Sequence, residues 1–247
     1  MIMTRFTLAV LLFIASLAPA PAQNSVDSSQ FFPFTVGTYW VYQGTVRWYD
    51  NETEKPASAD VTWRMTVERV IWRKGIVAAV VTGYPADLDF TAGTTEPKPW
   101  MIIENENHQV YFENLGPDFD LAKLNGDDHV FDKFMVNENY FFQWPMHVGA
   151  KFCDDEAGKR EDNMYCWFVN EIAPKRMVAI KGIASGEQSI YQLQYHTNPD
   201  DTIVELVQGI GLLSYKYHHH GTVADTELQL VEFHTGPEGV SIQGTKP

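Results

Sequence analysis

The residues best suited to chemistry lie near the C-terminal end of the chain, where positions 215–221 read YKYHHHG. In an extended strand successive side chains point to opposite faces, so His218 and His220 would share one face and His219 would lie on the other. Two imidazoles on one face of a strand are a partial ligand set for Zn²⁺ or Cu²⁺. The spacing therefore predicts a candidate metal site at His218 and His220.

A metal site of this kind needs a third and usually a fourth ligand. His196, His234 and Glu227 are candidates by residue type, but the sequence does not show which of them lie close to the two histidines. No H-E-x-x-H motif accompanies the cluster. The alternative interpretation is that the histidines make aromatic and polar cross-strand contacts near the end of a strand.

Acidic residues form a second group with chemical potential. Their clusters stand beside Gly, Pro or Asn, which is typical of solvated turns. Calcium could use such oxygen ligands, but no segment matches the EF-hand loop, and a glycosidase carboxylate pair is defined by a separation in space. The clusters are Asp87 and Asp89, Asp118 and Asp120, Asp127 and Asp128, Asp154 to Glu156, and Asp200 and Asp201.

The chain carries no G-x-S-x-G nucleophile elbow, P-loop or dinucleotide-binding fingerprint. Its net charge of −14 argues against nucleic acid as a partner, because phosphate recognition requires a basic surface. The same charge disfavours electrostatic docking on anionic membranes. These features favour a binding protein over an enzyme, with no cofactor beyond the zinc or calcium considered above.

The aromatic content, with 7 Trp, 11 Tyr and 15 Phe, has two interpretations. One is an apolar cavity inside a curved sheet that accepts a lipid, a hydrophobic small molecule or a peptide. The other is a β core built from large residues because sheets favour them. Under the first interpretation the candidate ligand-binding residues are Trp40, Trp63, Tyr215 and Tyr217.

Residues 1–22 have the three parts of a secretory signal peptide: Arg5, an apolar run over 6–17, and small residues that end in Ala20-Pro21-Ala22. The apolar run is shorter than the roughly 20 residues that span a bilayer as a helix. We expect cleavage before Gln23. The mature chain, without an integral membrane segment, would then be periplasmic or secreted.

Export makes the two cysteines informative. Cys153 and Cys166 enclose the polar segment DDEAGKREDNMY, and apolar residues flank both of them, as in a hairpin loop. In an oxidising compartment such a pair favours a disulfide. The absence of C-x-x-C spacing makes a redox-active or metal-binding role the weaker alternative.

Strand patterns dominate the rest of the chain. Between positions 59 and 72 apolar and polar residues alternate, which predicts a half-buried strand. Only positions 117–126 suggest a short helix. The proline-rich segment 85–99 is interpreted as a plain surface loop, and the alternative is a flap that covers another part of the protein. The other predicted strands read YWVYQGTVRW, IVAAVVTGY, WMIIE, HQVYFE, YCWFVNEI, RMVAIKGI, SIYQLQYH, TIVELV, LLSYKYHHH and ELQLVEF.

Two segments of the chain resemble each other. Residues 32–40, FPFTVGTYW, align without gaps to residues 144–152, WPMHVGAKF, and each copy precedes a strand, a polar loop and a second strand. We therefore expect one domain over 23–247, made of two related halves at about 31–125 and 140–235.

The chain also resembles a group of exported bacterial β proteins of unknown function. The resemblance rests on FPFTVGTYWVY, IKGIASGEQSIYQLQY and GIGLLSY, which are similar to the group's "PLxxGxxWxY", "PAGxFxxY" and "GxGLVxY" motifs; the chain departs from the middle motif at residues 184–187. It implies a curved antiparallel sheet or half-barrel, loosely similar to periplasmic lipoprotein carriers, and no catalytic residues.

These observations predict a mainly β protein: an antiparallel curved sheet, half-barrel or sandwich with at most one or two short helices. The function that fits best is a non-enzymatic binding or scaffolding module of the bacterial envelope with an apolar ligand cavity. The alternative is a metal-dependent enzyme or metal-binding protein centred on the three histidines.

Overall fold

The structure is a computed structural model that describes residues 31–116, 118–126, 128–183 and 185–236. The predicted signal peptide and the aspartate at position 127 lie outside these residues. So do Pro117, where the predicted helix begins, and Ala184, where the chain departs from the group's middle motif. Within the described ranges no helix is long and apolar enough to cross a membrane.

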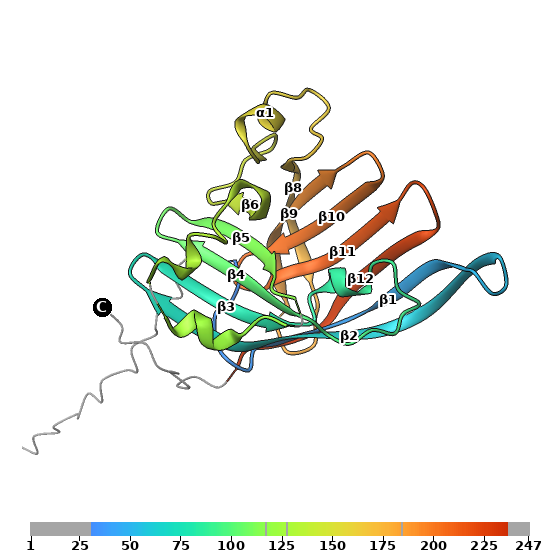
Figure 1. Cartoon of the computed structure of the whole chain (residues 1–247), viewed down its shortest axis with the longest axis horizontal. Coiled ribbons are helices and arrows are strands. Elements are labelled where there is room, and N and C mark those ends of the chain that lie inside the picture. Colours follow the sequence, from blue (N-terminus) through green and yellow to red (C-terminus); the bar gives the residue numbers. More distant parts are fainter. Residues whose placement is uncertain (1–30, 117, 127, 184, 237–247) are drawn as a thin grey trace, which may run out of the picture.

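The described residues form a single antiparallel sheet of 12 strands, which confirms the predicted mainly β class (Figure 1). The strand order is β6-β5-β4-β3-β2-β1-β12-β11-β10-β9-β8-β7, so two meanders join where β1 pairs with β12. The sheet curves until its end strands, β6 and β7, contact each other. The strands are β1 (Tyr39–Asp50), β2 (Lys55–Arg73), β3 (Ile76–Thr82), β4 (Pro99–Asn105), β5 (Gln109–Asn114), β6 (Tyr140–Gln143), β7 (Lys151–Phe152), β8 (Trp167–Val178), β9 (Gly186–His196), β10 (Asp200–Val207), β11 (Gly211–His219) and β12 (Ala224–His234).

Alternation along the strands gives the sheet two different faces. We call the face that carries Trp40, Trp63 and Tyr215 the inner face, and the opposite face the outer face. The inner face holds the larger apolar core, which extends over both meanders. On β2, for example, Trp63 and Met65 are buried on this side while Arg64 and Glu68 are exposed, as the sequence pattern predicts.

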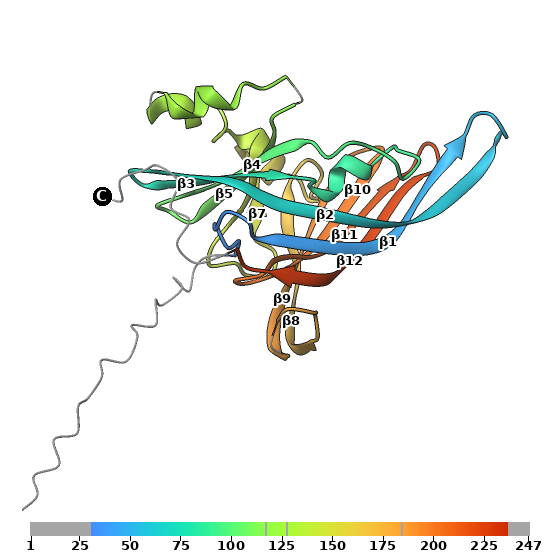
Figure 2. The same cartoon turned by 90° about the horizontal axis from the view of Figure 1, so that it is seen from below.

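A second apolar core lies on the outer face of β3, β4 and β5. Residues 118–126 and 128–139 cross this face and contain three 3-10 helices, η2 (Leu121–Asn125), η3 (Asp128–Phe131) and η4 (Asn137–Asn139), which lie above the strands in Figure 2. Because both faces of β3 are covered, five of its seven residues are buried. This explains its continuous apolar sequence.

Helices are brief, as predicted. The helix expected at 117–126 is the 3-10 helix η2; the Asp120 side chain accepts a hydrogen bond from the N–H of Ala122, and the helix ends at Gly126. The one α-helix among the described residues, α1 (Asp155–Gly158), lies in the loop between β7 and β8. The predicted disulfide between Cys153 and Cys166 closes that loop.

Two strand predictions need correction. The segments YCWFVNEI and RMVAIKGI were expected to be separate strands, but β8 runs through both of them as far as Val178. Register shifts at 169–171 and 173–176 interrupt its alternation, as β-bulges do. Because the alternation is lost there, the sequence pattern wrongly indicates that a strand ends. The short strand β6 was not anticipated, whereas β7 contains Phe152, which pairs with Trp167 as the predicted hairpin required.

The two copies of the repeated motif end in the same turn. Gly37 and Gly149 both have a φ of 83°. Each donates its N–H to the carbonyl of a valine, Val67 at 2.9 Å and Val169 at 2.8 Å, and the valine N–H donates back to the residue after the glycine. A register shift follows each valine. This geometry supports the division into two related halves, which remains a prediction.

Replacing either turn glycine tests whether the turns at Gly37 and Gly149 are structurally equivalent. We expect Gly37→Ala and Gly149→Ala each to lower the free energy of unfolding by about 1–2 kcal/mol, because a β-carbon is disfavoured at positive φ. Gly158→Ala is the control, since its added Cβ would lie 3.8 Å from Cys153 Sγ in ordinary contact. Urea unfolding measures the three values, and a cost at only one of the two turns would contradict their equivalence.

Candidate functional site

Residues 84–97 leave the sheet after β3, cross the inner face and return to β4 (Figure 1). We call this segment the inner strap. Its base is closed by the N–H of Gly83, which donates to the carbonyl of Lys98 at 3.1 Å. The strap begins with the 3-10 helix η1 (Pro85–Leu88), and Leu88 is only 1% exposed. The expectation of a plain surface loop was therefore wrong, because the strap buries side chains against the sheet.

Asp87 fixes the base of the strap. Its carboxylate accepts hydrogen bonds from the Lys98 N–H at 2.8 Å and from Trp100 Nε1 at 2.9 Å. Burial raises the pKa of Asp87, and these two bonds oppose that effect. Trp63 lies directly beneath, where its Nε1 donates to the carbonyl of Gly83 at 2.8 Å.

The middle of the strap packs against β11 through aromatic rings. Ring centroids lie 5.9 Å apart for Tyr84 and Tyr215, 5.4 Å for Phe90 and Tyr217, and 5.0 Å for Phe90 and His219. Further along, Gly93 lies so close to the inner face that an added Cβ would be 2.9 Å from the side chain of Val46. The strap therefore spans the sheet from β2 to β11.

The structure brings together three of the four predicted ligand-binding residues. Trp63, Tyr215 and Tyr217 all lie beneath the strap, whereas Trp40 lies elsewhere in the core. The Trp40 Nε1 donates to the carbonyl of Ile210 at 2.6 Å, and its ring packs on Phe233.

Asp89 is the least favourably placed residue of the strap. The Tyr215 hydroxyl donates to its Oδ2 at 2.5 Å, but its Oδ1 is buried without a hydrogen-bond partner. Burial raises the pKa of Asp89 to about 7, against hydrogen bonding by Tyr215 and Thr226. The next residue, Phe90, has a φ of 58°, which is strained for a bulky side chain.

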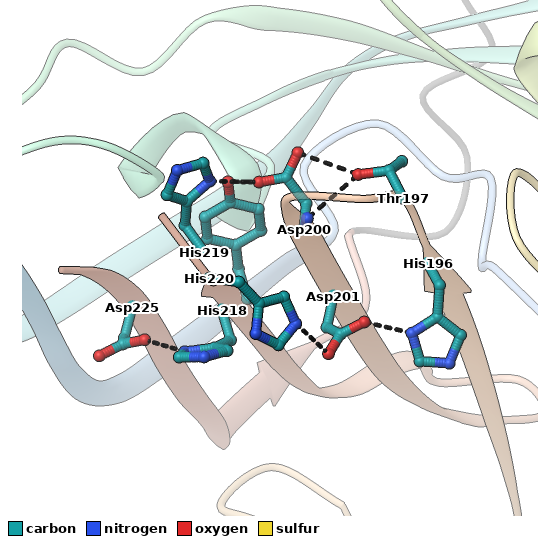
Figure 3. Close-up of polar contacts among 9 residues, drawn as sticks. His196, Thr197, Asp200, Asp201, His218, His219, His220 and Asp225 are labelled. Carbon is teal, nitrogen blue, oxygen red and sulfur yellow. Dashed lines mark hydrogen bonds and ion pairs between the residues drawn. The ribbon is translucent and has the colours of Figure 1, made fainter. Parts of the chain in front are cut away.

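Asp200, at the start of β10, completes the polar end of the site. Its Oδ1 accepts a hydrogen bond from the Tyr217 hydroxyl at 2.5 Å and lies 2.7 Å from Nδ1 of His219 (Figure 3). Burial alone would raise the pKa of Asp200, but these contacts and one with Thr197 hold it below its usual range. Asp89 and Asp200 are therefore carboxyl groups whose environments shift their pKa values in opposite directions.

The other two histidines of the cluster lie on the outer face. In Figure 3 they form a row with carboxylates: His218 contacts Asp225, and His220 and His196 both contact Asp201. A shallow polar groove of about 410 Å³ runs beside this row, and its lining includes Arg47, Lys216, His218, Asp225 and Glu227. As the alternation along β11 predicts, His219 lies on the inner face, whereas His218 and His220 lie on the outer face.

The candidate third metal ligands do not converge on His218 and His220. Glu227 pairs with Lys216, His234 packs against the ring of Tyr39, and His196 reaches His220 only through Asp201. Within the described part of the chain, no group of three or more His, Cys, Asp or Glu side chains is arranged to hold a metal ion.

Sequence reasoning missed Asp89 and Asp200 as site residues, because both stood among acidic clusters that resemble solvated turns. The alternation at positions 215–219 assigned Tyr215, Tyr217 and His219 to one face. It did not show that the strap and the start of β10 meet that face.

No protein-family model and no curated protein matches this chain. Two solved structures resemble it in overall shape. A candidate exported protein with a YmcC-like fold from Bacteroides fragilis has 10% identity and a TM-score of 0.40, over 83% of this chain and 99% of that one. A candidate lipoprotein from Parabacteroides distasonis has 13% identity and a TM-score of 0.39, over 84% of this chain and 99% of that one.

The position of Asp89 makes stability depend on pH. The folded state holds this carboxyl protonated up to a pKa of about 7, while the unfolded chain ionises it near the ordinary value of 3.8. The free energy of unfolding should therefore fall as pH rises between these two values. Relative to Asp89→Asn, this loss should reach about 4 kcal/mol at most.

Urea unfolding of both proteins between about pH 4 and pH 8 measures this difference. The exposed Asp118 supplies the control, and Asp118→Asn should follow the unsubstituted protein over the whole range. Parallel pH profiles for Asp89→Asn and the unsubstituted protein would contradict the burial of a protonated carboxyl.

Proposed function

We propose that this chain is an exported protein of the bacterial envelope that binds an apolar ligand without transforming it. The ligand, a lipid, hydrophobic small molecule or peptide, lies on the inner face between the sheet and the inner strap, which moves outward to admit it. Trp63, Tyr215 and Tyr217 contact it. The signal-peptide pattern of residues 1–22 supports export.

One observation carries this proposal: the strap covers the aromatic inner face at a local energetic cost. Asp89 buries a carboxyl oxygen without a partner, and Phe90 adopts a positive φ beside it. Each such feature costs on the order of 1–3 kcal/mol. A segment that only filled the core would not need these features, whereas segments that move during function are drawn from the less stable parts of a structure.

The surface beneath the strap suits an apolar ligand with a polar end. Tyr and Trp side chains combine large apolar rings with one hydrogen-bonding atom. Beneath the strap the hydroxyl of Tyr215 is directed to Asp89, and that of Tyr217 to Asp200. A ligand that enters beneath the strap therefore meets aromatic rings over most of its length and polar groups at one end.

Weakening the strap should strengthen binding. Leu88→Ala removes a buried side chain of the strap, at a cost of about 2–5 kcal/mol in packing, and Phe90→Ala removes the ring that covers Tyr217. We expect both variants to bind a naphthylamine-type apolar fluorescent probe at least about tenfold more tightly than the unsubstituted protein. Met177→Ala, which removes an exposed side chain on β8, is the control and should leave the affinity unchanged.

Mass spectrometry of lipid extracts from the exported protein supplies an independent readout, and a co-purifying lipid would support the proposal. Circular dichroism first establishes that both strap variants are folded. Folded variants that bind no probe, together with extracts that contain no ligand, would overturn the proposal.

A second candidate function, metal binding at His218 and His220, is favoured by the carboxylates behind both imidazoles. Histidines that ligate metals commonly hold a carboxylate with the other ring nitrogen. His218 Nδ1 contacts Asp225 and His220 Nε2 contacts Asp201, while the two ring centroids lie 4.7 Å apart. Under this proposal His218 and His220 would hold a zinc ion together with ligands that are not protein side chains of this cluster.

Elemental analysis of untagged protein after zinc loading and dialysis tests this candidate. We expect His218→Ala and His220→Ala each to lose the bound zinc, because either change removes half of the imidazole ligands. His147→Ala, an exposed histidine distant in sequence from the cluster, controls for the total number of histidines. Equal zinc content in all four proteins would exclude His218 and His220 as ligands.

A further inference from the structure

Three carboxylates of the inner-strap site differ in how well they are satisfied. Both oxygens of Asp87 accept hydrogen bonds, from Lys98 and Trp100. Asp200 is contacted by Tyr217, His219 and Thr197.

Asp89 is different. The Tyr215 hydroxyl donates to its Oδ2 and Thr226 also interacts with the carboxyl, but its Oδ1 is buried without a hydrogen-bond partner. A buried polar atom of this kind costs about 1–3 kcal/mol, so its presence in a folded protein calls for an explanation.

The groups that face Asp89 do not compensate a negative charge. The strap contributes Asp87 and Tyr84, and β10 contributes Asp200. The adjacent strands β11 and β12 contribute Tyr215, Tyr217 and Thr226. His219 contacts Asp200 rather than Asp89. Two acidic groups and several hydroxyls therefore surround the carboxyl, and no basic side chain is among the groups that set its pKa.

Aromatic rings border the same carboxyl. Tyr84 packs edge-on against Tyr215, and Phe90 packs edge-on against Tyr217. Aromatic faces attract cations by about 0.5–2 kcal/mol, and rings combined with carboxylates are the usual surroundings of a bound ammonium group. The residue types beneath the strap therefore match a cation better than an anion or a neutral group.

The site has a direction of entry. The side chain of Asp200 is 29% exposed and that of His219 is 17% exposed, while Phe90 above them is 61% exposed. A ligand that moves Phe90 aside meets the solvent-exposed Asp200 before it reaches the buried Asp89. The net charge of −14 also favours the approach of cations over anions.

We propose that the ligand of the inner face carries a cationic amine head group, which pairs with Asp89 at its unpartnered Oδ1 while its apolar part lies on the aromatic rings. This inference rests on the proposed function and names its ligand class. An anionic head group would place a further negative charge beside Asp87, Asp89 and Asp200. A neutral head group would leave Asp89 protonated, as in the free protein, and would gain no charge pairing there.

Proton linkage follows from this pairing. Asp89 is protonated in the free protein at mildly acidic pH, because burial raises its pKa to about 7. An ammonium group that binds there stabilises the ionised carboxylate, so one proton leaves Asp89 for the solvent as the amine binds. Charge is balanced, and the proton release can be measured.

The test compares three single-chain amphiphiles of equal length below their micelle concentrations: dodecylamine, dodecanoate and dodecanol. Displacement of the apolar probe from Leu88→Ala gives their affinities. We expect dodecylamine to bind at least about tenfold more tightly than the other two, at an ionic strength of about 0.5 M that screens surface charge. In the double variant Leu88→Ala/Asp89→Asn the preference for dodecylamine should disappear, while the affinity for dodecanol stays the same.

Asp118→Asn in the same background removes one exposed negative charge, and we expect it to keep the preference. Calorimetry at about pH 6 in two buffers of different ionisation enthalpy should show release of about one proton on dodecylamine binding, and none in the Asp89→Asn variant. A preference for dodecylamine that survives Asp89→Asn would overturn the inference. So would binding of the three amphiphiles with equal affinity, and that result would leave the proposed function in place. If none of the three binds, the proposed function fails as well.

Discussion

The need to cover the aromatic inner face of one long, curved sheet governs this structure. A 12-stranded sheet that curves until its end strands meet encloses an inner surface, and apolar side chains or a further segment must fill it. Phe31 fills part of it by packing against Phe142, Trp144 and Tyr191, which come from both meanders. The inner strap fills the region near β11. The aromatic content of the sequence is thus explained by the area of a concave surface.

The outer face differs between two regions of the sheet. Over β3, β4 and β5 it is covered by residues 118–126 and 128–139 and is apolar, whereas over β1, β10, β11 and β12 it carries charged pairs and a polar groove. The exposed edge of β8 also carries features that oppose pairing with another sheet. β7 pairs only with Trp167 and Phe168, and further along β8 lie Pro174, Lys175 and Arg176, a residue without an N–H donor followed by two charges. These features oppose the addition of another sheet at this edge.

Two kinds of carboxyl site result from this difference between the faces. On the outer face Asp201 and Asp225 are partly exposed and contact imidazoles, so their charge is easily accommodated. On the inner face Asp89 meets the hydroxyls of Tyr215 and Thr226, and its Oδ1 is buried without a partner. An aspartate carboxyl therefore has a favourable environment on the outer face and an unfavourable one on the inner face. The unfavourable position, that of Asp89, marks the candidate site.

The sequence by itself determined the features that depend on neighbouring residues. Alternation assigned Trp63 and Met65 to one face of β2, and placed His219 opposite His218 and His220. Export and a polar loop predicted the disulfide of Cys153 and Cys166. These predictions succeeded because strand geometry and short loops relate residues that are close in the chain. Where β-bulges interrupted the alternation, as along β8, the same reasoning failed.

Only the tertiary structure decided where the segments meet. Asp89 and Tyr215 are 126 positions apart, and their contact depends on the curvature of the whole sheet, the register of β10 with β11, and the path of the strap. In the sequence Asp89 resembles any acidic residue beside a turn. Its burial and its missing partner follow from packing between distant segments, which no local pattern of residues encodes.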